Sequence, residues 1–329
     1  MKKTFAVLLS GLLIGSLVFS LVACNDKEEP TPPADPIVLT DATGRSFTFD
    51  KDKLPNKVVS LSPGITECLY AMGLETLIVG CTDFCNYPAP AQDKFKIGGS
   101  SVNTQSTEKI MQALQGDKER GIILASGAAL NAVTSQMDSE GYTVFLTNVT
   151  TFESLFDCMR AYNTILGGTD YDRVEYVIAS MEARVKAVTD KLPASTPKVT
   201  VIHVMYNNLQ SACAGTKESM VIATAFGINL GDTFGSSYVI PNVESFIAAN
   251  PTIIVCVTDH GTGNGYIHTI TEDSRLAGMD AVKNGNVIEI EANSISRPGP
   301  RLIDALENYA KILHPEIFGI YQYDPYYYV

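Results

Sequence analysis

Residues 58–73 read VVSLSPGITECLYAMG, and this stretch predicts a strand that turns directly into a helix. Its apolar run ends at Ser62, and apolar residues return at helical spacing after Pro63, with Gly73 closing the helix. Ser is a favourable N-cap residue, and Pro fits the first turn. Because the first turn of a helix has free backbone N–H groups, Ser62, Pro63 and Gly64 are candidate ligand contacts. A strand-to-helix turn without a ligand is the alternative, and a phosphate loop of the type G-x-x-x-x-G-K-[ST] is absent from the stretch.

The same strand-then-helix pattern recurs along the chain. A tight hairpin is predicted at residues 41–45, and Thr150 and Glu153 have the spacing of a capping box. Strands alternating with helices predict parallel sheets covered by helices. Strands are expected at 57–62, 77–80, 121–125, 142–147, 198–206, 252–258 and 286–291, and helices at 63–72, 107–115, 217–226, 243–249 and 300–313.

One predicted helix is longer than the others and carries apolar residues at alternating steps of four and three. It covers residues 170–192 and ends before Pro193. A coiled coil is one interpretation, but only about three heptads are present, so we favour a helix that lies across two lobes. We therefore predict two α/β lobes with parallel central sheets, residues 37–168 and 194–329, joined by a long helix at 169–193, with a ligand cleft between them. The apolar positions are Val174, Ile178, Met181, Val185, Val188 and Leu192.

The N-terminus has the features of an export signal. Lys2 and Lys3 precede an apolar stretch from Phe5 to Val22, so residues 1–23 are predicted to be a signal peptide. The sequence LVAC at 21–24 resembles a bacterial lipobox, which would make Cys24 the site of lipidation; an ordinary signal peptide is the alternative. Residues 24–36 are acidic and Pro-rich and are predicted to be an extended tether. We expect an exported protein, lipid-anchored to a bacterial membrane in the periplasm or at the cell surface.

Composition excludes several classes of protein. The net charge of −12 disfavours nucleic-acid binding, which needs clustered Lys and Arg. Four scattered His residues, without H-x-x-x-H spacing, do not predict a resident metal, and the G-x-S-x-G motif is absent. We expect no cofactor and no enzymatic activity. Of the cysteines after Cys24, Cys81 and Cys85 are the best candidates to pair or to bind a group, although C-x₃-C alone does not define a zinc site.

Several stretches in sequence order resemble one family. The chain is similar to the cobalamin- and siderophore-type solute-binding proteins of bacterial ABC importers, from about Val38 to Phe318. This resemblance implies two Rossmann-like lobes joined by one helix, and capture of a corrinoid for delivery to a permease, with a ferric siderophore or haem as the alternative ligand. We expect a monomer. The stretches are DATGR at 41–45, VVSLSPGITECLYAMG at 58–73, LIVGCTDFCNYP at 77–88, KIGG at 96–99, TEKIMQAL at 107–114, VESFIAANPTIIV at 243–255, LAGMDAVKNGNVIEI at 276–290 and RPGPRLIDALENYAKILHPE at 297–316.

Polar and aromatic residues follow the predicted strands at the sheet edge where a cleft would open. Each group of candidate residues can also be interpreted without a ligand, as a packed loop, an exposed histidine or a surface ion pair. His203, within a strand pattern, is expected to be a core residue, and Arg301 is the alternative to Arg297 as the inward-facing arginine. The candidates are Asp83, Phe84, Asn86 and Tyr87; Tyr206 and Asn207; Asp259, His260 and Tyr266; and Arg297.

The resemblance further implies that Glu108 and Glu244, one in each lobe, meet arginines of the permease. The alternative is that each is a first-turn glutamate favoured by the helix dipole. Two rival functions remain open at this point. One is a metal-cluster enzyme that uses Cys81, Cys85 and Cys158, and the other is a scavenger or sensor of the same fold without a permease.

Overall fold

A four-stranded parallel sheet forms the centre of the first lobe in the computed structural model, which describes residues 36–99, 104–168, 171–258 and 265–323. The strand order is β4-β3-β5-β6. Both faces of the sheet are buried, which explains the almost continuous apolar runs of these strands. The strands are β3 (Lys57–Ser60), β4 (Ile78–Cys81), β5 (Gly121–Ser126) and β6 (Thr143–Thr147).

Helices cover the two faces of this sheet. Helices α1 (Pro63–Ala71) and α4 (Phe152–Ile165) pack on one face, and α2 (Thr107–Leu114) and α3 (Ala132–Ser139) on the other. A hairpin of β1 (Ile37–Thr40) and β2 (Ser46–Phe49) confirms the predicted turn, and its Arg45 donates a 2.7 Å hydrogen bond to the carbonyl of Val144 in β6. Short 3₁₀ helices complete the lobe: η1 (Lys51–Lys53), η2 (Glu75–Leu77) and η3 (Ala89–Asp93).

The sheet of the second lobe has parallel central strands, as predicted, and short antiparallel pairings at one edge that the sequence did not reveal, so the sheet as a whole is mixed. Strands β7, β11 and β12 are parallel, but β8 is antiparallel to both β7 and β10. A tight return at residues 205–210 is too short for a crossover helix, so the chain can only reverse direction. The order is β10-β8-β7-β11-β12, with β9 also paired to β7; the strands are β7 (Val199–Val204), β8 (Ser211–Ala212), β9 (Gly227–Asn229), β10 (Tyr238–Val239), β11 (Ile253–Val257) and β12 (Val287–Ile290).

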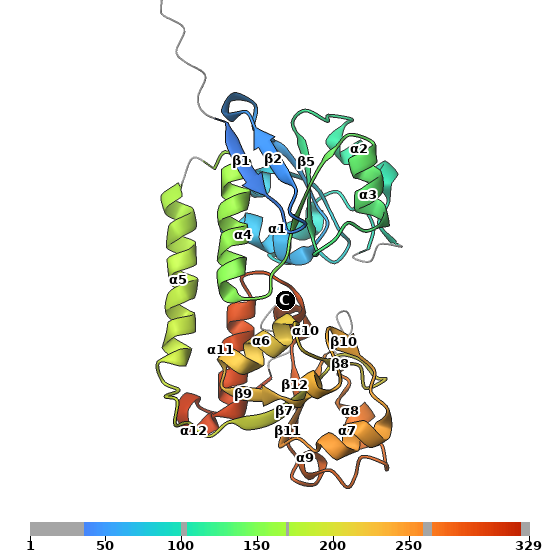
Figure 1. Ribbon diagram of the computed structural model, residues 1–329, viewed down its shortest axis with the longest axis vertical. Coiled ribbons are helices and arrows are strands. Elements are labelled where there is room, and N and C mark those ends of the chain that lie inside the picture. The colour runs from blue at the N-terminus through green and yellow to red at the C-terminus, as the bar shows by residue number, and fades with distance from the viewer. Residues whose placement is uncertain (1–35, 100–103, 169–170, 259–264, 324–329) are drawn as a thin grey trace, which may run out of the picture. The chain divides into compact units, whose positions relative to one another are not determined.

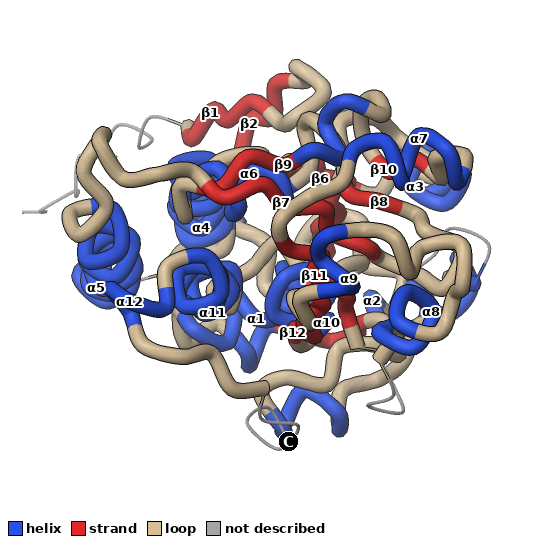
Figure 2. The backbone as a smooth tube through the Cα atoms, turned by 90° about the horizontal axis from the view of Figure 1, so that it is seen from below, coloured by secondary structure: helices blue, strands red, loops and turns tan. Residues whose placement is uncertain are grey.

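The helices of the second lobe also divide between the two faces of its sheet. Figure 2 shows α4, α5 and α11 on the same side of β7, β11 and β12. One face is covered by α6 (Lys217–Thr224), α10 (Ala292–Ser296) and α11 (Leu302–Leu313), with α12 (Pro315–Phe318) beside α11. The other face packs against α7 (Val243–Ala249), α8 (Ile267–Thr271) and α9 (Asp280–Lys283), and the 3₁₀ helix η5 (Leu230–Thr233) follows β9.

Helix α5 (Tyr171–Thr189) joins the lobes, as predicted (Figure 1). Towards its start, Glu175 pairs with Arg160 of α4 at 2.9 Å. Towards its end, Arg184 pairs with Asp304 at 2.6 Å and Glu307 at 2.8 Å, both in α11. One buried apolar cluster runs through α1, α4, α5, α6 and α11, so the lobes share a core. The residue boundaries expected for the two lobes stay a prediction.

The N-terminus of α4 differs from the capping box that the sequence predicted. Its N-cap is Thr151, whose side chain accepts from the backbone N–H of Ser154 at 3.0 Å, and the Ser154 hydroxyl accepts from the backbone N–H of Thr151 at 2.9 Å. The predicted box of Thr150 and Glu153 is therefore displaced by one residue. Within the described residues, none of the helices is both long and apolar enough to cross a membrane.

Candidate functional site

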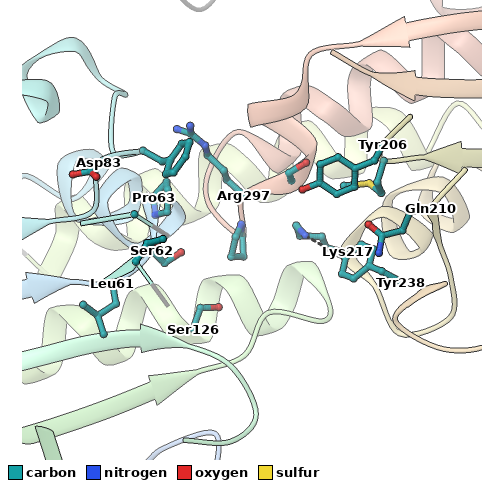
Figure 3. Close-up of a pocket in the computed structure, with 16 residues that line it drawn as sticks. Leu61, Ser62, Pro63, Asp83, Ser126, Tyr206, Gln210, Lys217, Tyr238 and Arg297 are labelled. Atoms are coloured by element: carbon teal, nitrogen blue, oxygen red, sulfur yellow. Dashed lines mark hydrogen bonds between the residues drawn. The ribbon is translucent and has the colours of Figure 1, made fainter. Parts of the chain in front are cut away.

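A cavity of about 910 Å³ lies at the carboxyl ends of β3, β4, β5 and β7, with residues of both lobes in its walls. Figure 3 shows first-lobe side chains facing second-lobe side chains, with Arg297 between the two groups. The volume lies near the upper end of the range for small-molecule sites, about 300–1,000 Å³. The walls contain Leu61, Ser62, Pro63, Asp83, Phe84, Gly99, Thr104, Ser126, Met205, Tyr206, Gln210, Lys217, Tyr238, Ser296, Arg297 and Pro298.

The first-lobe wall contains four of the predicted site residues: Ser62, Pro63, Asp83 and Phe84. Ser62 is the N-cap of α1, but its side chain makes no capping hydrogen bond. Its carbonyl instead accepts from the Ser60 hydroxyl at 2.9 Å. Phe84 leaves 48% of its surface exposed, which gives the wall a flat apolar face.

Three other predicted residues of the first lobe lie outside the cavity walls, at the contact between the lobes. A Cβ at Gly64 would lie 2.5 Å from the carbonyl oxygen of Pro298, so glycine here allows the two backbones to approach. Asn86 accepts a 2.7 Å hydrogen bond from Arg297. Tyr87 lies 4.4 Å beneath the guanidinium of Arg301 and lines a second cavity of about 550 Å³.

The second-lobe wall contains Tyr206, which follows β7 as predicted. Tyr206 is 43% exposed, and its ring centroid is 5.9 Å from that of Tyr266, a predicted site residue that is not among the wall residues. Asn207 is exposed in the turn after β7 and is not among the wall residues. Asp259 and His260 lie outside the residues that the structure describes.

Sequence reasoning missed a charge cluster at the start of α6, in which Glu218 is fully buried and Tyr238 is 39% exposed. Lys217 Nζ lies 3.0 Å from Glu218 Oε1 and 2.9 Å from the Tyr238 hydroxyl, which donates to Glu218 Oε2 at 3.0 Å. Burial opposes the charge of Lys217, but the Glu218 carboxylate and Tyr238 outweigh it and raise the pKa of the ammonium. Burial raises the pKa of Tyr238 to about 12. Lys217 therefore stays positive at the cavity, with its charge balanced by Glu218.

A second buried cluster joins the lobes. Glu67 of α1 accepts from Arg301 at 2.6 and 3.0 Å and from Arg297 at 3.3 Å, and all three residues are at most 5% exposed. Burial and the charge of Arg301 lower the pKa of Arg297, although Glu67 opposes this. Arg297 and Arg301, which the sequence suggested as ligand contacts, thus both bind a carboxylate of the first lobe. Sequence reasoning missed Glu67, although a carboxylate among Ile65, Cys68 and Leu69 is a signal that could have revealed it.

His203 is buried in β7 against Tyr309 of α11, as its strand pattern predicted. Its Nδ1 forms a short hydrogen bond with the Tyr309 hydroxyl, and Nε2 has no hydrogen-bond partner among the described residues. Burial lowers the pKa of His203 to about 4, with Glu218 opposing and Lys217 reinforcing the shift.

Glu108 and Glu244 lie in the first turns of α2 and α7, one in each lobe, and both are exposed. Neither is among the wall residues of the cavity. The positions fit the helix-dipole interpretation of each residue, and they leave both carboxylates accessible.

Replacing Glu67 should destabilise the fold strongly. In Glu67→Gln, the two buried arginines keep a single nearby carboxylate, Glu291, 4.0 Å from Arg301, and breaking a buried pair in this way costs about 3–5 kcal/mol. Denaturant unfolding measures the change. Asp190→Asn, which breaks the exposed pair with Lys186 at 2.6 Å, is the control and should change the unfolding free energy by about 0–0.5 kcal/mol. A loss in Glu67→Gln no larger than the control would contradict the role of the cluster.

His203 should make stability depend on pH between 4 and 6.5. The unfolded chain takes up a proton near the ordinary histidine pKa of about 6.5, but the folded protein does so only near 4. Stability should therefore fall as the pH drops through this window, by about 3 kcal/mol. The unfolding free energy of His203→Asn should not show this fall between pH 6.5 and 4. The control His268→Asn, at an exposed residue, should show the same fall as the unmodified protein. Parallel curves for all three proteins would refute the assignment.

Known proteins share both the sequence pattern and the fold. The family described as "Periplasmic binding protein" matches residues 58–293. A cobalamin-binding protein of Halobacterium salinarum is 22% identical over 317 residues, covering 92% of this chain and 84% of the relative. An uncharacterized ABC transporter substrate-binding lipoprotein of Bacillus subtilis, YvrC, is 24% identical over 322 residues, covering 95% of this chain and 96% of the relative.

The likeness extends to solved structures. A periplasmic haem-binding protein from Pseudomonas aeruginosa superposes with a TM-score of 0.66 at 20% sequence identity, covering 80% of this chain and 94% of that chain. At this identity the match concerns the fold, two α/β lobes joined by a long helix. Together with the matched residues 58–293, this places the chain in the periplasmic binding protein family.

Proposed function

We propose that this protein is the substrate-binding component of an ABC importer, that it captures a corrinoid in the cavity between its lobes, and that it delivers the corrinoid to a permease. The observation that carries the proposal is the 910 Å³ cavity, with Phe84 on one wall and Tyr206 on the other. Exposed rings on opposite walls suit a large flat ligand, because aromatic faces pack well against a macrocycle. The cobalamin-binding relative and the ABC-transporter relative support the ligand and the role.

The charge of the cavity favours a corrinoid over an anionic iron complex. Two of the wall residues are cationic, Lys217 and Arg297. Each already has a carboxylate partner: Glu218 pairs with Lys217, and Glu67 pairs with Arg297 and Arg301. Glu291 lies 4.0 Å from Arg301, so two carboxylates face the two arginines. A ferric catecholate or other anionic siderophore, or haem, brings negative charge that these paired cations would not balance. A corrinoid instead presents an amide rim, which matches neutral donors and acceptors such as Ser62, Ser126 and Gln210.

Titration calorimetry tests the ligand directly. The protein is titrated with cyanocobalamin, cobinamide, haem and a ferric catecholate siderophore under the same conditions. We expect saturable heat with the two corrinoids and weaker or no heat with the others. Heat with haem or the siderophore alone would overturn the corrinoid and establish the alternative ligand of the same transport role.

Tyr206 should contribute measurably to affinity. In Tyr206→Ala the cavity loses an exposed ring, and removal of an aromatic contact of about 1–2 kcal/mol weakens binding roughly tenfold. Ile228→Ala is the control, because Ile228 is also 43% exposed but lies on β9 away from the cavity walls. Equal cyanocobalamin affinities for the two variants would remove Tyr206 from the binding surface.

We also propose that the mature protein is a monomer held on the membrane by lipid at Cys24. Two or more acyl chains make such anchoring effectively stable, because each buried CH₂ contributes about 0.8 kcal/mol. The acidic, Pro-rich residues 25–36 would let the lobes reach the permease. The lipoprotein relative supports the anchor.

Permease docking is proposed to use Glu108 and Glu244. A single exposed ion pair contributes only about 0–1 kcal/mol, so two pairs, one on each lobe, would set orientation more than affinity. In Glu108→Lys/Glu244→Lys, cyanocobalamin uptake by cells should fall, while binding by the purified protein stays unchanged. The control is Glu153→Lys, an exposed first-turn glutamate of α4. Unchanged uptake in the double variant would favour a scavenger or sensor that works without docking.

A further inference from the structure

Two cysteines lie together beneath the cavity wall. Cys81 ends β4, and a turn closed by the hydrogen bond from Cys85 N–H to the Thr82 carbonyl, 3.0 Å, folds the chain back on itself. The ammonium of Lys96 bridges the two residues, because its Nζ lies 3.4 Å from Cys81 Sγ and 2.9 Å from the Cys85 carbonyl oxygen, and each thiol shifts the pKa of the other. Both side chains are at most 1% exposed. A four-residue separation closed by a tight turn suits the short Cα separation of a disulfide.

The two sulfur atoms have different polar neighbours. Cys85 Sγ lies 3.2 Å from both the Thr66 and the Thr82 hydroxyl oxygens. Lys96 Nζ lies 3.4 Å from Cys81 Sγ and donates to the Cys85 carbonyl at 2.9 Å. Hydrogen bonding from Cys81, supported by Thr66, Thr82 and Lys96, lowers the pKa of Cys85 against the effect of burial. Interaction with Cys85, together with burial, raises the pKa of Cys81, whose Sγ donates to the Ala91 carbonyl at 3.8 Å. Thiolate character therefore concentrates on Cys85, and Cys81 keeps its proton.

We propose that Cys81 and Cys85 are a reversible disulfide site, oxidised by exchange with a small-molecule or protein disulfide. The Cys85 thiolate attacks one sulfur of the disulfide and expels the other sulfur as a thiolate, giving a mixed disulfide. Cys81 then loses its proton to solvent and attacks Cys85 Sγ, which expels the second thiolate. Both expelled thiolates take up protons. Two protein thiols are oxidised to one disulfide while the external disulfide is reduced to two thiols.

This site would connect oxidation to the geometry of the cavity. The turn between the two cysteines carries Asp83 and Phe84, both wall residues. The two residues that follow are Asn86, which accepts from Arg297, and Tyr87, which stacks under Arg301. A covalent link across the turn would hold one wall, and its contact with the other lobe, in a narrower range of conformations. Exported proteins meet an oxidising environment in which such links form.

The remaining described cysteines have surroundings that disfavour the reaction. Cys68, Cys158, Cys213 and Cys256 are all buried, and burial raises the pKa of each thiol. Cys68 and Cys158 also interact electrostatically with each other. A link between these two is therefore the competing product that the experiment must distinguish.

The test equilibrates the full chain with oxidised or reduced glutathione, both in the native state and during refolding, so that burial cannot prevent access. Free thiols are then alkylated in denaturant and counted. We expect the oxidised sample to lose two thiols per chain. Cleavage after Glu75 and Glu108 gives a fragment whose only cysteines are Cys81 and Cys85, and its mass should fall by two hydrogens. Cleavage before Asp83 should leave the two pieces joined until reduction.

Variants separate this site from its competitor. Cys81→Ser and Cys85→Ser should each lose no thiol pair, whereas Cys213→Ser should still lose two thiols, as the unmodified chain does. Backbone hydrogen exchange at residues 82–88 should slow in the oxidised protein, with no change in α3. An unaltered fragment after refolding in oxidised glutathione, or a disulfide that joins Cys68 to Cys158 instead, would overturn the proposal.

Discussion

The buried cluster of Glu67, Arg297 and Arg301 is the interaction on which the relation between the lobes depends. One carboxylate from α1 receives three hydrogen bonds from two guanidinium groups of the second lobe. Burying three charges is costly, and such a cluster is weak evidence of stability relative to an apolar replacement. Its effect is geometric, because a planar guanidinium that donates through both Nε and Nη2 to one carboxylate, as Arg301 does to Glu67, tolerates little displacement. The cluster therefore fixes where the second lobe meets the first lobe.

Two further constraints act beside the cluster. Gly64 and Pro298 bring the two backbones together where a Cβ would not fit, and α5 holds α4 with one end and α11 with the other through paired arginines. The apolar core also continues from one lobe into the other. Packed cores respond in discrete steps rather than by continuous deformation. We infer that the lobes close little around a ligand, so the width of the cavity is set largely by the protein.

Sequence patterns predicted those parts of the structure that repeat. The strands of the first lobe, the long helix and the burial of His203 follow from hydrophobic periodicity, which operates over many residues. The placement of Ser62, Asp83, Phe84 and Tyr206 at strand ends follows from the topology of parallel sheets. Strands β8 and β10 have two residues each, which is too short to give a periodic pattern. The antiparallel pairings of these two strands were missed for this reason, whereas β7, β11 and β12 run parallel as predicted.

The polar clusters could not be predicted because each depends on contacts between distant segments. Glu67 and Arg301 are 234 positions apart, so no local pattern pairs them. Lys217 and Glu218 have the sequence of an ordinary solvated helix start, yet both form hydrogen bonds with Tyr238, which lies on a strand that the sequence did not reveal. The same pairings determine the electrostatics of the cavity. Arg297 and Lys217 both reach its walls. Glu218 balances Lys217, and Glu67 with Glu291 balances Arg297 with Arg301, so the walls offer hydrogen bonds with little net charge. A ligand held there gains more from its shape and its amide or hydroxyl groups than from charge, which is the physical basis for proposing a neutral-rimmed macrocycle.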